Sequence, residues 1–256
     1  MTEPLLRVEN LVVDFPDPHR SGHRVRALDD VSLTMHEGEI LGLVGESGSG
    51  KTTLAKTVLR LYRPSEGRIA LNGVDIACLD EAQLRPYRRR AQMVFQDPLS
   101  SFNPRHTIGA AITTPLLLHR VCTKPVARSV VERILADVGL PAGFASRYPH
   151  QLSGGQLQRA AIGRALALSP ALLVADEAVS KLDVSVRAQI LNLLKRVHAN
   201  HNLSLLFITH DLHVTKFLCH RIGVMHRGKL LEIGQTSEMF ARPSNEYTRS
   251  LLQTIQ

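Results

Sequence analysis

The chain has 256 residues, and its 31 lysines and arginines outnumber 23 aspartates and glutamates to give a net charge of +8. With 44% hydrophobic and 21% charged residues, the composition is that of a globular protein, which excludes a disordered, collagen-like or coiled-coil chain. Three cysteines that stand far apart, with no Cys-x-x-Cys pair, indicate neither a disulfide framework nor a zinc site.

Apolar runs such as 171–175 fall far short of the roughly 18 residues that a membrane-spanning helix needs. The N-terminus lacks the basic start and long apolar core of a signal peptide. We therefore expect a protein that is cytosolic or peripheral to a membrane. The positive charge suits nucleic acid or an anionic surface. Its densest cluster surrounds Tyr87 and is either a solvated helix face or loop, or a contact site: Arg85, Arg88, Arg89 and Arg90.

The first elements expected along the chain are strands. Residues 8–15 and 25–35 are rich in Val and Leu and predict an antiparallel pair joined by a loop at 16–22. The almost wholly apolar run 40–44 predicts a strand buried on both faces. A glycine-rich loop at 45–50 and a helix to about residue 61 follow.

Later strands alternate with helical segments. Strands are expected at 91–95, 171–175 and 204–209, a helix at 186–198, a hairpin at 222–233 that turns at 226–229, and a terminal helix. This alternation predicts an α/β core with right-handed crossovers. The long stretch 97–167 has a helical pattern that prolines are expected to break: Pro104, Pro115, Pro125, Pro141 and Pro149.

The loop after strand 40–44 carries the first chemical motif. Residues 45–52 read GESGSGKT and fit the phosphate-loop pattern G-x-x-x-x-G-K-[ST] in full. Glycines let the backbone aim successive N–H groups at phosphate oxygens, and the helix that follows adds its positive end. Lys51 can reach the β- and γ-phosphates, and the Thr52 hydroxyl can coordinate Mg²⁺. The alternative is an ordinary glycine-rich turn.

A pair of carboxylates ends the strand 171–175. Asp176 is placed to hold the Mg²⁺ shell, and Glu177 to polarise the water that attacks the γ-phosphate. Alone, an apolar run before Asp-Glu is common, so this interpretation depends on the phosphate loop.

The segment Leu-Ser-Gly-Gly-Gln at 152–156 precedes a helical stretch. Ser153 can cap that helix, and the glycines leave backbone N–H groups for another anion. One chain would then carry two phosphate-recognising surfaces for one phosphate loop. This makes sense if two such chains pair head to tail and each completes the site of the other.

Together, the phosphate loop, the LSGGQ segment, the carboxylate pair and Thr209-His210-Asp211 resemble an ABC-transporter ATPase cassette over about residues 5–250. The resemblance implies an α/β P-loop NTPase (RecA-like) core at 1–96 and 166–256. It adds an N-terminal antiparallel β subdomain and an inserted α-helical subdomain at 97–165.

The resemblance also implies the residues of the site and its cofactors, ATP and Mg²⁺. Gln96 would be the glutamine that senses Mg²⁺ and the transport partner, and His210 the histidine that contacts the γ-phosphate. Phe15 would stack on adenine, although a packed strand residue is the alternative. The catalytic set is then Lys51, Gln96, Glu177 and His210, and the metal set Thr52, Gln96 and Asp176. The nucleotide set is Gly45, Ser47, Gly48, Ser49, Gly50, Lys51, Thr52, Thr53, Phe15, Ser153, Gly154, Gly155 and Gln156.

Two residues depart from the family pattern. A small residue is usual where Lys181 stands, and proline is frequent where Ala178 stands. Lys181 would lie at the seam of the dimer, near the opposite site, which puts full symmetry of the two sites in question. The alternative is a lysine that extends to solvent.

Four segments resemble the ATPases of dipeptide, oligopeptide and nickel importers: 95–105, 147–151, 184–186 and 245–252. We expect a second, related ATPase chain as head-to-tail partner, two transmembrane permease subunits, and indirectly an extracytoplasmic solute-binding protein. The chain would lie at the cytoplasmic face of the cell membrane. Its short ending favours the nickel or metallophore branch weakly over the peptide branch.

Two rivals remain at this point. An ABC-type ATPase acting on nucleic acid, in DNA repair or on the ribosome, would suit the positive charge. However, the chain carries no long coiled-coil insertion, zinc motif or second cassette. An exporter ATPase is disfavoured by the importer-like segments. We therefore expect an importer ATPase that does not act on nucleic acid.

Overall fold

The computed structural model describes residues 3–17 and 22–253, so the loop predicted at 16–22 lies largely outside the described residues. The chain separates into two units, Met1–Tyr87 with Ser204–Gln256 and Arg88–Leu203. The division predicted from the sequence, with a helical subdomain at 97–165, follows other boundaries and stays a prediction.

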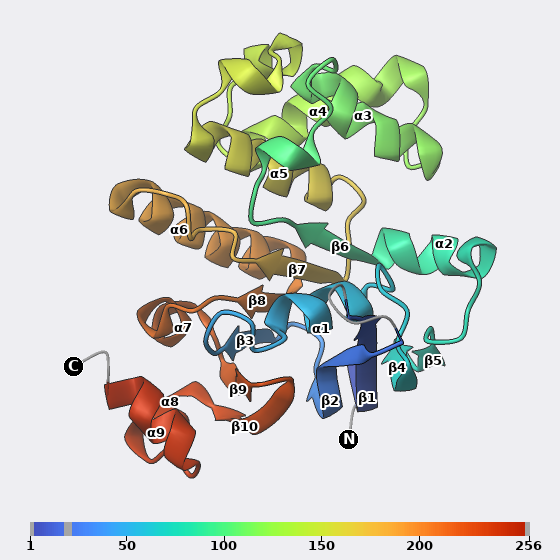
Figure 1. Ribbon diagram of the computed structural model, residues 1–256. Coiled ribbons are helices and arrows are strands. Elements are labelled where there is room, and N and C mark those ends of the chain that lie inside the picture. The colour runs from blue at the N-terminus through green and yellow to red at the C-terminus, as the bar shows by residue number, and fades with distance from the viewer. Residues whose placement is uncertain (1–2, 18–21, 254–256) are drawn as a thin grey trace. The chain divides into compact units, whose positions relative to one another are not determined.

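An antiparallel sheet with the order β2-β1-β4-β5 begins the first unit (Figure 1). Strands β1 (Leu6–Pro16) and β2 (Arg24–Met35) confirm the predicted antiparallel pair. Strands β4 (Glu66–Leu71) and β5 (Val74–Asp75) were not predicted. Neither shows a clear strand pattern in the sequence, because β4 starts with an exposed Glu-Gly-Arg and β5 has only two residues.

The first unit also holds the strands in the order β10-β9-β3-β8. Strand β3 (Ile40–Val44) is parallel to both β8 (Ser204–Ile208) and β9 (Arg221–His226). Every residue of β3 and β8 is buried, as their apolar runs predict. Strand β10 (Lys229–Gln235) completes the predicted hairpin with β9, and its turn uses left-handed backbone at Arg227 and Gly228.

Short helices complete this unit. Helix α1 (Lys51–Val58) follows the glycine-rich loop and ends three residues before the predicted position, since Arg60 takes a left-handed φ of 54°. Helix α2 (Glu81–Arg90) begins in the first unit and ends in the second, and it carries the arginine cluster, so that segment is helical. The last helices are α7 (Leu212–Leu218), α8 (Thr236–Ala241) and α9 (Glu246–Gln253).

The second unit pairs two parallel strands, β6 (Ala91–Val94) and β7 (Leu172–Asp176), and adds helices. These are α3 (Ile108–Leu118), α4 (Lys124–Asp137), α5 (Gly154–Leu166) and α6 (Val184–His201), with 3₁₀ turns at 99–101, 142–146 and 149–151. One expected break is wrong, because Pro115 lies inside α3. Burial of Ile112 and Leu116 on either side keeps the helix continuous there, despite the backbone hydrogen bond that proline removes.

The α/β fold class predicted from the sequence is confirmed. Among residues 3–17 and 22–253, no helix combines the length and apolarity needed to cross a membrane.

Candidate functional site

The glycine-rich loop connects β3 to α1 and takes a conformation that needs its glycines. Gly45 and Gly50 have φ values of 149° and 99°, which side-chain-bearing residues rarely adopt. A Cβ on Gly45 would lie 2.1 Å from the carbonyl oxygen of Met225, at the end of β9. On Gly50 it would lie 2.8 Å from the carbonyl oxygen of Ala27, on β2. The loop is therefore held tightly against two strands of its own unit.

Lys51 folds back over the loop that precedes it. Its side chain is buried, and Nζ donates to the carbonyl oxygens of Gly45 and Glu46, both at 2.7 Å, and to Ser49 Oγ at 3.1 Å. The ammonium thus sits at the centre of the loop, where an anion bound by the loop would meet it. Helix α1 starts at this lysine and has no acidic residue in its first turn. A cation and a helix N-terminus at one point favour a phosphate group.

The turn of the β9–β10 hairpin is hydrogen-bonded to the phosphate loop. The Gly228 N–H donates to the Ser49 carbonyl oxygen at 3.0 Å, and the Gly228 carbonyl oxygen accepts from the Asp29 N–H at 2.9 Å. Lys229 Nζ lies 3.1 Å from Asp29 Oδ2, so one aspartate holds the turn through both backbone and side chain. These contacts tie the phosphate loop to strand β2.

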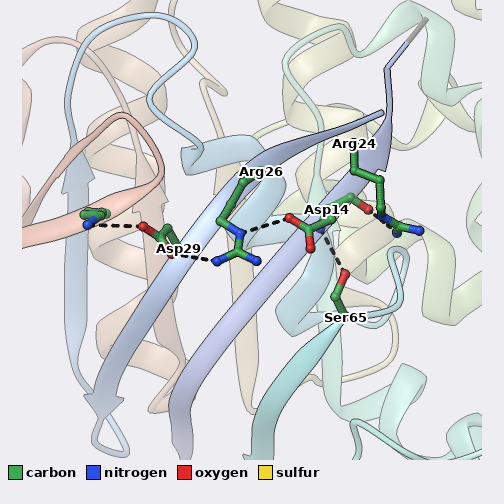
Figure 2. Close-up of polar contacts among 6 residues, drawn as sticks. Asp14, Arg24, Arg26, Asp29 and Ser65 are labelled. Atoms are coloured by element: carbon green, nitrogen blue, oxygen red, sulfur yellow. Dashed lines mark hydrogen bonds and ion pairs between the residues drawn. The ribbon is translucent and has the colours of Figure 1, made fainter. Parts of the chain in front are cut away.

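An ion-pair chain continues from Asp29 to strand β1. Figure 2 shows Arg26 between two carboxylates, with Nε 3.1 Å from Asp14 Oδ1 and a terminal nitrogen 3.2 Å from Asp29 Oδ1. The hydrogen bonds to Asp14 and then Asp29 raise the pKa of Arg26, and those from Lys229 and then Arg26 lower the pKa of Asp29. Both shifts favour the charged forms of Arg26 and Asp29. Asp14 immediately precedes Phe15, the residue predicted to stack on adenine. The series of ion pairs therefore connects the strand that carries Phe15 to the hairpin turn that is bonded to the phosphate loop.

Phe15 and His210 occupy different surroundings in the same unit. The Phe15 ring is half-buried and meets the Tyr62 ring edge-on at a centroid distance of 5.1 Å. His210 is exposed just after β8, and the N–H of its neighbour Thr209 donates to the Leu43 carbonyl oxygen at 3.1 Å. Because β3 and β8 are parallel neighbours, His210 and the phosphate loop leave the sheet at the same edge.

In the second unit, the parallel pairing of β6 with β7 brings two predicted site residues together. Gln96 Nε2 donates to Glu177 Oε2 at 2.5 Å. Glu177 has a left-handed φ of 46°, unusual for a residue with a long side chain, and its carbonyl oxygen accepts from Ser180 Oγ at 3.0 Å. Asp176, one residue earlier, is buried at the end of β7. Two carboxylates and an amide thus gather at the carboxyl ends of these strands.

Helix α5 starts at Gly154, inside the LSGGQ segment rather than after it, and Ser153 caps it as predicted. Ser153 is its N-cap, with Oγ accepting from the Gln156 N–H at 3.4 Å while Gln156 Oε1 accepts from the Ser153 N–H at 3.0 Å. A Cβ on Gly155 would lie 2.5 Å from Val186 Cγ1 on α6. Gly155 therefore allows close packing of two helices, in addition to freeing backbone N–H groups at a helix start.

Sequence reasoning missed the residues that support the loop. No sequence motif includes the residues that hold the turn against β2, which are Asp29, Gly228 and Lys229. Their role depends on contacts between segments about 200 residues apart in the sequence. Tyr247 belongs to the segment 245–252 that resembles importer ATPases, and the structure places its ring on that of His226, at the end of β9, with centroids 4.1 Å apart.

Comparison with known proteins gives one consistent family. Residues 28–180 match the family model described as ABC transporter. The oligopeptide transport ATP-binding protein AppF of Bacillus subtilis is 47% identical over 232 residues, which are 90% of this chain and 70% of that protein. The probable peptide ABC transporter ATP-binding protein y4tS of Sinorhizobium fredii is 46% identical over 256 residues, with 98% and 72% covered.

Two further matches extend this result. The glutathione import ATP-binding protein GsiA of Pectobacterium atrosepticum is 45% identical over 99% of this chain, which spans 41% of that longer protein. Among solved structures, an ATP-binding cassette in a dimeric post-hydrolysis state with ADP and Pi is 29% identical. That match covers 90% of this chain and 98% of the cassette, with a TM-score of 0.82. From its sequence, its fold and these relatives, the chain belongs to the ABC transporter family, as an ATP-binding protein that hydrolyses ATP to power transport.

Proposed function

We propose that this chain is the ATPase subunit of an importer of peptides. The observation that carries the proposal is the intact phosphate loop, with Lys51 Nζ bound at its centre, in a chain that is 44–47% identical to ATP-binding proteins named for peptide or oligopeptide transport. The reported relatives are named for peptides, oligopeptides and glutathione, so the expected tilt toward nickel gains no support from them.

In this proposal the triphosphate binds the N–H groups of residues 45–53 and the Lys51 ammonium, which would exchange its bonds to loop carbonyls for phosphate oxygens. The hydroxyl of Thr52, the amide of Gln96 and the carboxylate of Asp176 are hard oxygen donors of the kind that Mg²⁺ prefers. Bound there, Mg²⁺ would neutralise charge on the phosphates. Phe15 would contact the adenine.

Hydrolysis in this proposal depends on Glu177 as general base and His210 as the contact to the γ-phosphate. The hydrogen bond from Gln96 holds the Glu177 carboxylate in one orientation. The left-handed φ of Glu177 also turns the backbone out of the extended conformation of β7 at this residue. Gln96 would thus join the orientation of the base to the segment that follows it, residues 97–107.

The chain has one phosphate loop and one LSGGQ segment, and we infer its partners from this. In a head-to-tail dimer, the γ-phosphate held by a second, related cassette would be contacted by Ser153, Gly154, Gly155 and Gln156. Cassettes described as dimeric are among the solved relatives. Two permease subunits, served by an extracytoplasmic binding protein, would provide the path for the peptide. The chain would then lie at the cytoplasmic face of the cell membrane. The nucleic-acid alternative gains no support from the reported relatives.

The test is affinity purification from native membranes in mild detergent with ATP, using Glu177→Gln, which should bind ATP but turn over slowly. We expect two polytopic membrane proteins and a second ATPase to be recovered with it. The control is Lys51→Ala, which should lose ATP binding and the ATP-dependent part of the recovery. Recovery with ribosomes or nucleic acid would contradict the transport proposal, and unchanged ATP affinity in Lys51→Ala would contradict the phosphate-loop assignment.

A further inference from the structure

The segment that follows Gln96 folds into a compact turn at residues 99–102. Leu99–Ser101 form one turn of 3₁₀ helix, and the Phe102 N–H donates to the Leu99 carbonyl oxygen at 3.2 Å. The Pro98 carbonyl oxygen accepts from the Ser101 N–H at 3.2 Å and from Ser101 Oγ at 2.7 Å. Leu99 is 52% exposed, whereas Phe102 is buried. The 99–102 turn therefore has an outer side that is open to a partner and an inner side that is packed within the second unit.

Arg164 of helix α5 contacts the inner side of this turn at two consecutive residues. A terminal nitrogen of its guanidinium donates to the Ser101 carbonyl oxygen. The guanidinium also lies over the Phe102 ring, with Cζ 4.4 Å from the ring centroid, which is within the range of a cation–π contact. The backbone of Ser101 and the side chain of Phe102 are thus bound by one cationic group.

The charge of Arg164 stands where burial disfavours it. The side chain is half-buried, and burial lowers the pKa of Arg164. Within the part of the chain that the structure describes, no carboxylate forms an ion pair with this guanidinium. Removing a cation from water without a counter-ion costs free energy that an apolar side chain of the same length does not cost. The guanidinium is therefore better explained by its two contacts with the turn than by packing.

Helix α5 connects these contacts to the LSGGQ segment. The helix runs without a proline from Gly154 to Leu166, so Arg164 stands ten residues (164 − 154), or about 15 Å, from its start. An uninterrupted helix of this length moves as one body. A displacement of the 99–102 turn that Arg164 follows would therefore reach the LSGGQ end of α5.

We propose that Arg164 is a positioning residue, which fastens the 99–102 turn to the helix of the LSGGQ segment. The inference deepens the proposed function and rests on it, because the outer side of the turn, with Leu99, would face a permease subunit. Contact there would move the turn, and Arg164 would pass this movement to α5. Loss of the fastening would slow hydrolysis but leave ATP binding intact, since Lys51 and the phosphate loop belong to the other unit.

The experiment compares Arg164→Met with the unmodified chain in two assays. Hydrogen exchange is measured on the purified chain, and ATP hydrolysis on the complex recovered from native membranes. Methionine keeps much of the length of arginine and removes its charge. The matched control is Arg147→Met, because Arg147 also lies over an aromatic ring, that of Phe144, at 4.1 Å and in the same unit. Arg164→Lys restores a cation and a donor and tests rescue.

We expect Arg164→Met to speed hydrogen exchange of the Ser101 and Phe102 amides about tenfold, since both close the turn that the guanidinium holds. The kcat of the complex should fall about tenfold, while KM and the ATP affinity of the purified chain stay within about twofold. Arg164→Lys should recover part of kcat, and Arg147→Met should match the unmodified chain in both assays. Faster exchange throughout α5 without rescue by lysine would overturn the inference, because it would mean a general loss of packing.

Unchanged exchange at residues 101 and 102 in Arg164→Met would also overturn it. If Arg164→Met folds poorly, Phe102→Leu removes the ring from the turn and leaves α5 intact, and an unaltered kcat there would be equally decisive. Failure of the proposed function has a different sign, because Glu177→Gln would then recover no membrane proteins. Hydrogen exchange needs no partner, so it decides on the fastening even in that case. The positioning role alone fails if the membrane complex is recovered and Arg164→Met hydrolyses ATP in it at the full rate.

Discussion

At the scale of single residues, the conformation of the phosphate loop depends on backbone angles that only glycine adopts easily. Gly45 combines a φ of 149° with a carbonyl oxygen 2.1 Å from where a Cβ would stand, whereas Gly48 has a φ of 79° and open space around it. The first glycine therefore meets two obstacles to substitution and the second meets one. Comparing substitutions at Gly45 and Gly48 therefore separates the effect of a positive φ from the effect of a steric clash with Met225.

We predict that Gly45→Ala destabilises the chain by about 3 kcal/mol and abolishes ATP binding, because the loop must move off β9. Gly48→Ala should cost about 1 kcal/mol, the effect of backbone strain alone. Urea unfolding of both variants measures the difference. Equal losses of stability would show that contact with Met225 is not what constrains Gly45.

The residues of the motif could be predicted from the sequence, but their supports could not. GESGSGKT identifies Lys51 by local spacing, and an apolar strand before Asp-Glu identifies Glu177. The left-handed φ of Glu177 and its bond from Gln96 depend on pairing between strands some 80 residues apart. Gly228 donates to Ser49 across 179 positions (228 − 49). Local patterns carry no information on which distant segments meet.

At the scale of elements, the LSGGQ segment serves the packing of helices as well as an anion. The start of α5 lies against the start of α6, where a Cβ on Gly155 would come within 2.5 Å of Val186 Cγ1. A side chain at 155 would push the two helix starts apart. The start of α5 belongs to the LSGGQ segment, which is predicted to face the partner cassette, so its spacing from α6 matters to the proposed dimer.

We predict that Gly155→Ala lowers stability by about 1–3 kcal/mol through overpacking, and that Val186→Ala restores part of the loss in the double variant by removing the contacting methyl group. Thermal unfolding of the singles and the double gives the coupling. Gly143→Ala is the control, since nothing lies within 4 Å of its Cβ position. Equal losses in Gly155→Ala with and without Val186→Ala would argue against this contact as the cause.

Elements with continuous apolar runs were the easiest to predict. Strands β3, β7 and β8 are buried along their whole length, and their sequences show little else than apolar side chains. Strand β4 and helix α2 were not predicted, because the first half of β4 is exposed and α2 is largely polar and exposed, so neither the strand period nor the helix period stands out in the sequence. Helix α3 continues past Pro115 because burial of its apolar face outweighs the tendency of proline to break a helix.

At the scale of the whole molecule, the net charge of +8 has two competing interpretations. It could hold the chain to anionic lipid directly, where each basic residue near the surface contributes about 1 kcal/mol. Alternatively, it is an ordinary surface property, and association with the membrane depends on packed contacts with permease subunits. Some basic residues are already paired with carboxylates, as Arg26 is with Asp14 and Asp29 in Figure 2 and as Lys229 is with Asp29, which favours the second interpretation.

Salt separates the two because it screens charge but not packing. At 1 M salt the Debye length is about 3 Å, so attraction between a basic surface and lipid headgroups is lost, while an apolar interface persists. We predict that native membranes keep the chain through a 1 M sodium chloride wash and release it in alkaline carbonate, as immunoblots of pellet and supernatant would show. The purified chain should likewise bind anionic vesicles at low salt and leave them at 0.15 M. Release from native membranes by salt alone would mean that lipid, rather than a protein partner, holds this ATPase at the membrane.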